Sequence, residues 1–288
     1  MGAAARRAEA LGFTSVSVSD HTISTTGPES DGVTAVWPDW SVLSTYLALQ
    51  TTRLRVLTSL VIPYRRVLPM AKQIATIDVV SDGRFTLAAA VGWLRPEFEM
   101  LGVDYQQRGS ITDEYLRAMK ILWSEEEPAF AGQHVSFRDI VFEPKCVQKP
   151  HVPIWIAGGS GPGPIRRLLQ HGDGWMPMGG GLDQELCDTV ARVKEEAAAH
   201  GRDPEGFTFR YTIGIGKANA ALASISKSIS VDDPAAVAPS ESPGDVAAEI
   251  ASFEEAGFTE LAINFPGESA GEVMEQLDWF GREVMPLL

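Results

Sequence analysis

The sequence predicts an α/β protein of the TIM type, a (β/α)8 barrel that lacks its first strand. Strand-like and helix-like segments alternate along nearly the whole chain. The strands are short apolar runs, which are typical of parallel strands buried on both faces. Seven such strands, each followed by a helix or helix-like segment, come after a leading helix. An open doubly wound sheet would show the same alternation. The number of units favours the barrel, although no strand precedes residue 3.

Each element is predicted from its local pattern. Residues 3–11 form a helix that Gly12 ends, and residues 14–19 alternate as a strand with Val16 and Val18 on one face. Apolar and β-branched runs predict further strands at 53–62, 84–91, 153–157, 174–178, 207–215 and 261–265. Apolar periodicity predicts further helices at 40–49, 70–80, 113–123, 165–171, 182–200, 246–256 and 270–284. A single domain, 1–288, would contain them all, with a β excursion at 127–143 and an irregular insertion or lid at 217–242.

The composition indicates a globular protein, since 44% of the 288 residues are hydrophobic and 22% are charged. The net charge of −14 argues against a nucleic acid or an anionic membrane as partner, because both require clustered Lys and Arg. The two cysteines, Cys146 and Cys187, suggest no disulfide framework, and no histidine pair has metal-ligand spacing. No membrane span or signal peptide is recognisable, so we expect a soluble cytoplasmic protein without a metal.

A candidate catalytic pair, Asp20 and His21, ends the first strand. The carboxyl ends of the strands carry the chemistry in proteins of the barrel type. A carboxylate beside a histidine can orient it, and the imidazole can exchange a proton near neutral pH. Taken alone, such a pair is more often an ordinary polar junction between a strand and a loop.

Small residues end the next two strands. Thr58, Ser59 and Leu60 precede a proline, and they would touch a ligand ring or hold a strained backbone. Simple termination of the strand by the proline is the alternative. Three alanines then lead to Gly92 and Trp93, which leaves room for a flat ligand against the backbone. Tight packing of small residues at the barrel centre is the alternative there.

Two glycine-rich segments follow later strands and open helices. The first contains Gly158, Gly159 and Ser160, and the second contains Met178 and Gly179. Backbone N–H groups in such turns bind phosphate without a lysine. A dinucleotide fold is not indicated, because the Gly-x-Gly-x-x-Gly spacing and the acidic residue beyond it are missing. Two adjacent segments of this kind suggest a shared phosphate site, with ordinary strand-to-helix turns as the alternative.

Taken in order, these segments resemble the bacterial luciferase-like monooxygenase family of flavin and deazaflavin oxidoreductases. The resemblance spans nearly the whole chain, and its most specific parts are residues 78–84 and 172–175. Its other parts are residues 8–13, 19–21, 57–63, 71–77, 91–93, Glu97–Phe98, Arg108, 153–159 and 255–258. The strand that begins most members of the family has no counterpart in this chain.

The resemblance implies a luciferase-like barrel that forms a homodimer and holds a ring cofactor and a small-molecule substrate at its mouth. Asp20, His21 and Trp93 look like the branch that uses coenzyme F420, whereas other members use FMN. In that branch a hydride would pass between C5 of the deazaflavin and the substrate. His21 would give or take a proton, and Asp20 would orient it.

The same resemblance assigns supporting roles to the other segments. A cis peptide bond between Ser59 and Leu60 would back the ring, Gly92 would let it approach, and the glycine-rich segments would hold the phosphate. The alternatives are an FMN-dependent monooxygenase and a non-catalytic paralogue that binds a ligand or a partner.

Overall fold

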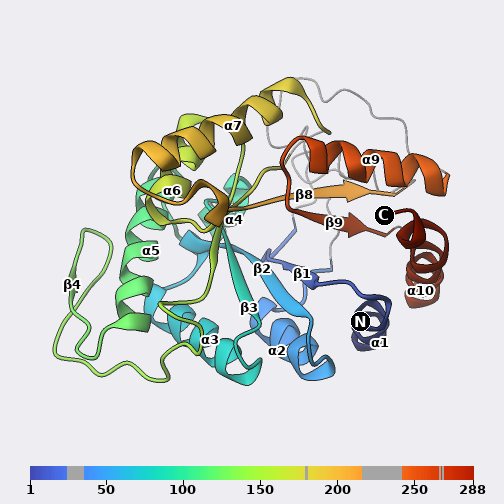
Figure 1. Ribbon diagram of the computed structural model, residues 1–288. Helices are drawn as coiled ribbons and strands as arrows, with labels where there is room; N and C mark the ends of the chain where they lie inside the picture. The colour runs from blue at the N-terminus through green and yellow to red at the C-terminus, as the bar shows by residue number, and fades with distance from the viewer. Residues whose placement is uncertain (25–35, 179–180, 216–241, 266, 268) are drawn as a thin grey trace.

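The computed structural model describes residues 1–24, 36–178, 181–215, 242–265, 267 and 269–288. Among these residues, seven parallel strands form one sheet in the order β1-β2-β3-β6-β7-β8-β9. Figure 1 shows that the sheet curls into a nearly closed barrel with helices around its outside. The predicted barrel with one strand too few is therefore confirmed.

The bounds of the barrel elements agree with the predicted order. The strands are β1 (Ser15–Ser19), β2 (Arg55–Val61), β3 (Phe85–Ala90), β6 (Ile154–Ala157), β7 (Gly174–Met176), β8 (Thr208–Gly214) and β9 (Glu260–Asn264). The helices around them are α1 (Gly2–Leu11), α2 (Trp40–Gln50), α3 (Val67–Val80), α5 (Arg108–Ser124), α6 (Pro162–His171), α7 (Gln184–Ala199), α9 (Pro243–Glu255) and α10 (Ala270–Trp279). The predicted stop of the first helix is confirmed, because Gly12 takes a left-handed conformation with φ 97°.

Several segments differ from the prediction in kind or extent. A short helix, α4 (Arg95–Leu101), was not predicted; its second residue, Pro96, is accepted because the first turn needs no N–H from it. Helix α5 begins at Arg108 rather than at residue 113. The predicted β excursion is the hairpin of β4 (Phe130–Ala131) and β5 (Ser136–Phe137). Of the segment 217–242, residues up to 241 lie outside the described residues.

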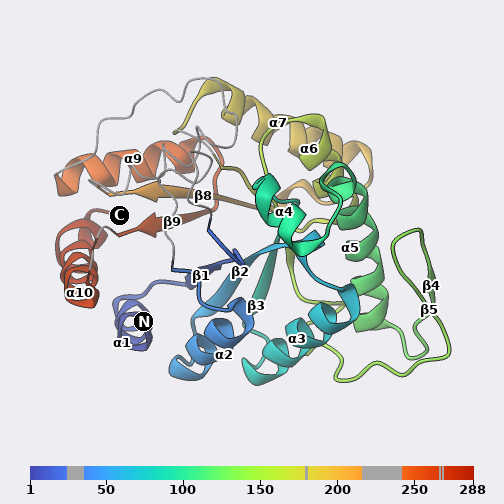
Figure 2. The ribbon, with the colours of Figure 1, turned by 180° about the vertical axis from the view of Figure 1, so that it is seen from behind.

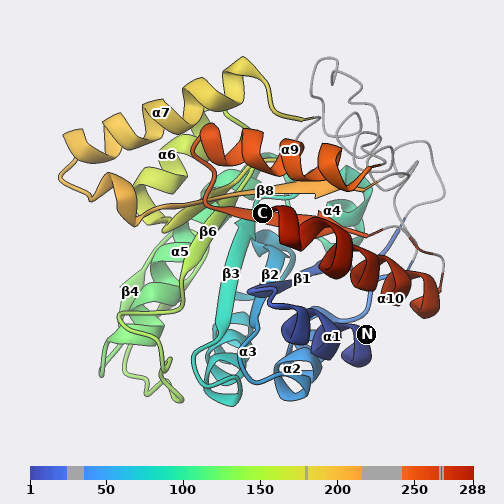
Figure 3. The same cartoon turned by 45° about the vertical axis from the view of Figure 1, so that its right-hand side comes forward.

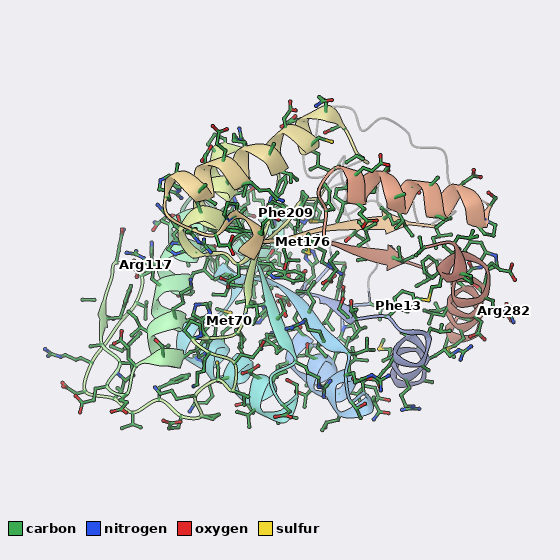
Figure 4. All side chains as sticks on the ribbon, viewed as in Figure 1. Phe13, Met70, Arg117, Met176, Phe209 and Arg282 are labelled. Carbon is green, nitrogen blue, oxygen red and sulfur yellow. The ribbon has the colours of Figure 1, made fainter. Side chains whose placement is uncertain are left out.

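Apolar side chains pack on both sides of the sheet. A cluster inside the barrel is formed by Leu57, Ala88, Trp155, Ala157 and Met176; Figure 4 labels Met176 among the strands. A larger cluster fills the layer between the sheet and the surrounding helices. Alternate residues of each strand therefore face the interior or the helices, and only the first set can contact a ligand inside the mouth.

Side chains close the barrel where the missing strand would lie. β1 and β9 are the two ends of the sheet, as predicted for strands that flank a gap. Ser15 of β1 donates to the Glu260 carboxylate of β9 at 2.9 Å, and Arg210 of β8 donates to Glu260 at 3.1 Å and to Ser17 at 2.5 Å. Figure 3 shows α1 and α10 packed side by side outside this seam.

The described residues contain neither a membrane-spanning helix nor a metal-binding cluster. None of their helices has both the length and the apolar character that crossing a lipid bilayer requires. No three of their His, Cys, Asp and Glu side chains gather in a way that could hold a metal ion.

Candidate active site

Glu97 holds His21 at the carboxyl end of β1. Nδ1 of His21 lies 2.8 Å from Oε2 of Glu97, the third residue of α4. The other carboxylate oxygen accepts hydrogen bonds from the N–H groups of Thr22 at 2.5 Å and Ile23 at 3.3 Å. Glu97 therefore ties the segment after β1 to the helix after β3, and Figure 2 shows that helix, α4, in the foreground of the barrel.

This contact fixes where His21 can exchange a proton. A carboxylate only accepts hydrogen bonds, so Nδ1 of His21 donates and Nε2 is the atom left to give or take a proton. Complete burial of Glu97 opposes its charge, but hydrogen bonds, chiefly from His21, outweigh burial and keep the pKa of Glu97 below its ordinary value. Burial, reinforced by the Glu97 carboxylate, raises the pKa of the neighbouring Tyr64. The site therefore pairs an ionised carboxylate with an imidazole.

The orienting role predicted for Asp20 is wrong. Its carboxylate is held by the guanidinium of Arg65 through two hydrogen bonds of 2.5 and 2.6 Å, and it also accepts from the N–H of Val61 at 3.3 Å. Neighbouring residues of an extended chain point to opposite sides, which is why Asp20 and His21 do not meet. Asp20 instead fastens the end of β1 to the turn between β2 and α3.

Two tryptophan rings lie next to His21. The ring of Trp37 is 4.8 Å from the imidazole, centroid to centroid, and the ring of Trp93 is 6.0 Å away and nearly perpendicular to it. Trp93 was predicted to lie at the site and is brought there. Trp37, just before α2, was not predicted, because no spacing in the sequence connects it to His21.

Of the three predicted residues on β2, one side chain faces the barrel interior. Ser59 pairs in register with Ala88, which belongs to the interior cluster. The hydroxyl of Thr58 instead forms a 2.8 Å hydrogen bond with Ser44 of α2, and Leu60 packs in the outer cluster. Thr58 and Leu60 therefore cannot offer their side chains to a cofactor in the mouth.

The remaining expectations for β2 and β3 also change. The cis peptide bonds of the described residues both precede prolines, so the Ser59–Leu60 bond is trans, and both of its residues pair in regular register with β3. Gly92 has φ 82°, and a side chain there would come within 2.5 Å of Val61 and 2.8 Å of Phe98. Packing of the protein itself thus accounts for this glycine.

The first glycine-rich segment forms an open loop between β6 and α6. A side chain added at Gly159 would meet nothing within 4 Å. The N–H groups of Gly159 and Ser160 donate to no other backbone group of the described residues. The guanidinium of Arg192, from α7, donates to the Ser160 carbonyl at 2.9 Å, whereas the Ser160 hydroxyl is bonded to the Glu185 carboxylate. The loop therefore carries both N–H groups without a backbone acceptor among the described residues and a nearby negative charge.

Two prolines reduce the donors at the start of α6. Pro162 and Pro164 both lie in its first turn, and neither has a backbone N–H. The loop itself must then supply most of the donors that the sequence led us to expect from the helix end. Met178, beyond β7, is 44% exposed, while Gly179 lies outside the described residues.

Comparison with known proteins decides the family. The family described as luciferase-like monooxygenase matches residues 1–218. The chain belongs to this family. A Mycobacterium tuberculosis protein of uncharacterised function is 32% identical over 214 residues, which cover 70% of this chain and 74% of the relative.

Relatives of this luciferase-like protein use two different cofactors. An F420-dependent glucose-6-phosphate dehydrogenase of Kineococcus radiotolerans is 29% identical and covers 98% of this chain and 90% of its own. An FMNH2-dependent dimethylsulfone monooxygenase of Pseudomonas putida is 26% identical and covers 76% of this chain and 69% of its own. The family therefore makes the protein an oxidoreductase without choosing between the cofactors.

Solved structures share the fold of this luciferase-like protein. The monooxygenase RslO1 of Streptomyces bottropensis has a TM-score of 0.83 at 21% identity, covering 98% of this chain and 92% of its own. An F420-dependent secondary alcohol dehydrogenase has a TM-score of 0.79 at 22% identity, covering 99% and 93%.

Proposed function

We propose that this protein is an F420-dependent oxidoreductase that transfers a hydride between C5 of the deazaflavin and a small organic substrate. The observation that carries the proposal is the hydrogen bond between His21 and the buried Glu97 carboxylate. The deazaflavin, when bound, supplies a two-electron hydride carrier, so the protein must handle the accompanying proton. Nε2 of His21 accepts the proton of a substrate hydroxyl as the carbon beside it gives up a hydride, and returns it in the opposite direction.

The remaining residues fit a flat cofactor with a phosphate. Small side chains, Ser59 and Ala88, line the interior of the barrel, and Trp93 stands beside His21. The loop N–H groups at Gly159 and the guanidinium of Arg192 are donors suited to a phosphate. Gly158 and Met178 belong to the same proposed phosphate site, whereas Gly179, which the sequence analysis assigns to it, lies outside the described residues.

Separate titrations with F420 and FMN test the proposal. We expect saturable binding of F420, followed by its fluorescence, and no comparable binding of FMN. Binding of FMN alone would favour an FMN-dependent monooxygenase, for which the Pseudomonas putida relative is the precedent. Binding of neither would leave a non-catalytic protein and overturn the proposal.

We also infer that two copies pair through α2. Val42, Tyr46 and Leu49 lie on one face of this helix and are 70%, 45% and 65% exposed. Apolar side chains in such a row are typical of an interface. Leu49→Glu should give a monomer in light scattering, whereas Glu254→Gln, on the exposed face of α9, should keep the mass of the dimer. A monomeric unsubstituted protein would contradict the inference.

A further inference from the structure

Tyr64 carries a hydroxyl that is buried without a hydrogen-bond partner among the described residues. The residue lies in the turn between β2 and α3 and is only 6% exposed. Its ring packs edge-on against the ring of Phe98 at 4.8 Å, and Phe98 directly follows Glu97 in α4. A buried donor without an acceptor has lost its bonds to water and gained nothing in return. The hydroxyl of Tyr64 therefore needs an explanation.

The Glu97 carboxylate is the group best placed to accept this hydrogen bond. Apart from burial, it acts on the Tyr64 hydroxyl more strongly than any other charged group does, and it raises the pKa of that hydroxyl. Two further charged groups face the hydroxyl: the Asp20 carboxylate acts in the same direction, and the Arg65 guanidinium opposes it. Both oxygens of Asp20 are already bound by Arg65. Glu97 is therefore the acceptor that the hydroxyl of Tyr64 would find first.

A count of donors leaves one position on Glu97 for this hydroxyl. An ionised carboxylate has about four acceptor positions, two on each oxygen. The N–H groups of Thr22 and Ile23 take both positions on Oε1. Nδ1 of His21 takes one of the two positions on Oε2. The remaining position therefore lies on the oxygen that faces His21, next to a donor of Tyr64 that lacks an acceptor in the described part of the chain.

We propose that Tyr64 is a positioning residue whose hydroxyl donates the fourth hydrogen bond to the Glu97 carboxylate and so controls how strongly this carboxylate holds Nδ1 of His21. A fourth donor stabilises the charge of a completely buried carboxylate. Burial opposes that charge, yet His21 first and Tyr64 next lower the pKa of Glu97. Because the charge is shared between two donors on one oxygen, Oε2 also pulls less strongly on the Nδ1 proton of His21.

Nitrogen NMR of the His21 imidazole tests the inference without a cofactor. The chain has five histidines, so the signals of His21 are identified as those that disappear in His21→Ala. Tyr64→Phe keeps the ring and removes only the hydroxyl. The bond from Nδ1 of His21 to Glu97 should then strengthen, and the Nδ1 signal should move downfield. The melting temperature should fall slightly, because a buried hydrogen bond is lost.

Tyr105→Phe is the matched control for this substitution. The Tyr105 ring packs edge-on against the same Phe98 ring at 5.1 Å, but Tyr105 is not among the groups that act on the pKa of Glu97. Its variant should leave the Nδ1 signal of His21 in place. If the Tyr64 hydroxyl had no partner in solution, Tyr64→Phe would leave that signal unchanged and raise the melting temperature. If the hydroxyl served Asp20 instead, the signal would be unchanged and the melting temperature lower. Either result overturns the inference.

The pH dependence of turnover tests the same role, and this part rests on the proposed function. Loss of a hydrogen bond to the ionised form raises the pKa of Glu97, so the acid side of the kcat profile should move to higher pH by roughly one unit in Tyr64→Phe. KM should change little, because Tyr64 is covered by the protein itself. An unshifted acid side would overturn the inference. If the unsubstituted protein shows no F420-dependent turnover, the proposed function fails, and the NMR comparison still decides the role of Tyr64.

Discussion

At the scale of single residues, the proposed function gives His21 and Glu97 different tasks. Replacing His21 by Ala removes the proton-exchanging atom, so turnover should fall about 10²–10⁴-fold with a verified substrate. Glu97→Gln keeps the shape but removes the negative charge beside His21 and replaces one of the two accepting oxygens by an NH2 donor, so it should lower turnover about 10²-fold or more. Deazaflavin affinity should stay nearly constant in both variants, which fluorescence titration can measure.

Asp20 provides the contrast to this prediction. Asp20→Asn breaks the pair with Arg65 but leaves the contact between His21 and Glu97 in place. It should therefore lower the free energy of unfolding and change turnover little. If Asp20→Asn abolished turnover while Glu97→Gln preserved it, the assignment of partners would be reversed.

The sequence predicted His21 better than it predicted the partner of His21. A histidine at a strand end is visible as a pattern, and its position follows from the strand. The partner depends on which side chains meet in space, and adjacency misled because Asp20 and His21 point in opposite directions. Glu97 was visible only through the family resemblance, 76 residues away along the chain. The same alternation separates Ser59 from Thr58 and Leu60.

At the scale of elements, the loop between β6 and α6 tests the phosphate site. Gly159→Asp places a carboxylate in open space beside the donors and should abolish F420 binding. Glu185→Gln removes the negative charge bonded to Ser160 and should strengthen it. Affinity should rise or hold steady from low to physiological salt, because screening weakens the repulsion of the net charge more than it weakens short-range donors. A steep fall of F420 affinity with salt, or normal F420 binding by Gly159→Asp, would show that the phosphate does not bind at this loop.

Hydrogen bonds of the Glu9 carboxylate join α1 to the residues just before β2, and protonation of Glu9 at low pH should weaken them. Its carboxylate accepts from the N–H groups of Thr52, Arg53 and Leu54, and these bonds, the one from Arg53 first, lower its pKa to about 2. Because the pKa of Glu9 is lower in the folded state than in the unfolded state, the ionised carboxylate stabilises the folded protein above pH 4.5. This stabilisation is lost as the pH falls toward 2. Glu9→Gln should therefore destabilise the protein at pH 7. In urea unfolding, its difference from the original protein should shrink between pH 4.5 and 2; a constant difference would contradict this.

Element order was predictable because each strand and helix has a local pattern. The short helix α4 was not, because a seven-residue helix with a proline in its first turn shows neither a clear period nor a uniform helix propensity. This omission mattered for the proposed function, since α4 carries Glu97.

At the scale of the whole molecule, the seam between β1 and β9 depends on Arg210. Glu260→Ala leaves this guanidinium, only 2% exposed, without its carboxylate, and should cost about 2–4 kcal/mol of unfolding free energy. Glu205→Ala breaks an exposed pair with Lys194 and should cost less than about 1 kcal/mol. Urea unfolding measures both changes in unfolding free energy. Equal changes would show that the Arg210–Glu260 pair at the seam stabilises the protein no more than an exposed pair does. The gap itself was predictable by counting strands, whereas the side chains that cross it were not.

Side chains, rather than backbone hydrogen bonds, close the barrel between β1 and β9, so this seam is the weakest part of the sheet. β3 is hydrogen-bonded through its backbone to β2 and β6, whereas β1 and β9 each have one such neighbour in the sheet. Brief openings should then begin at the seam and spread inward, so amide hydrogen exchange should be fastest in β1 and β9 and slowest in β3. Because His21 lies two residues beyond the end of β1, the same fluctuation would move the residue that we propose to exchange a proton, and a ligand that contacts His21 would slow exchange along the entire edge.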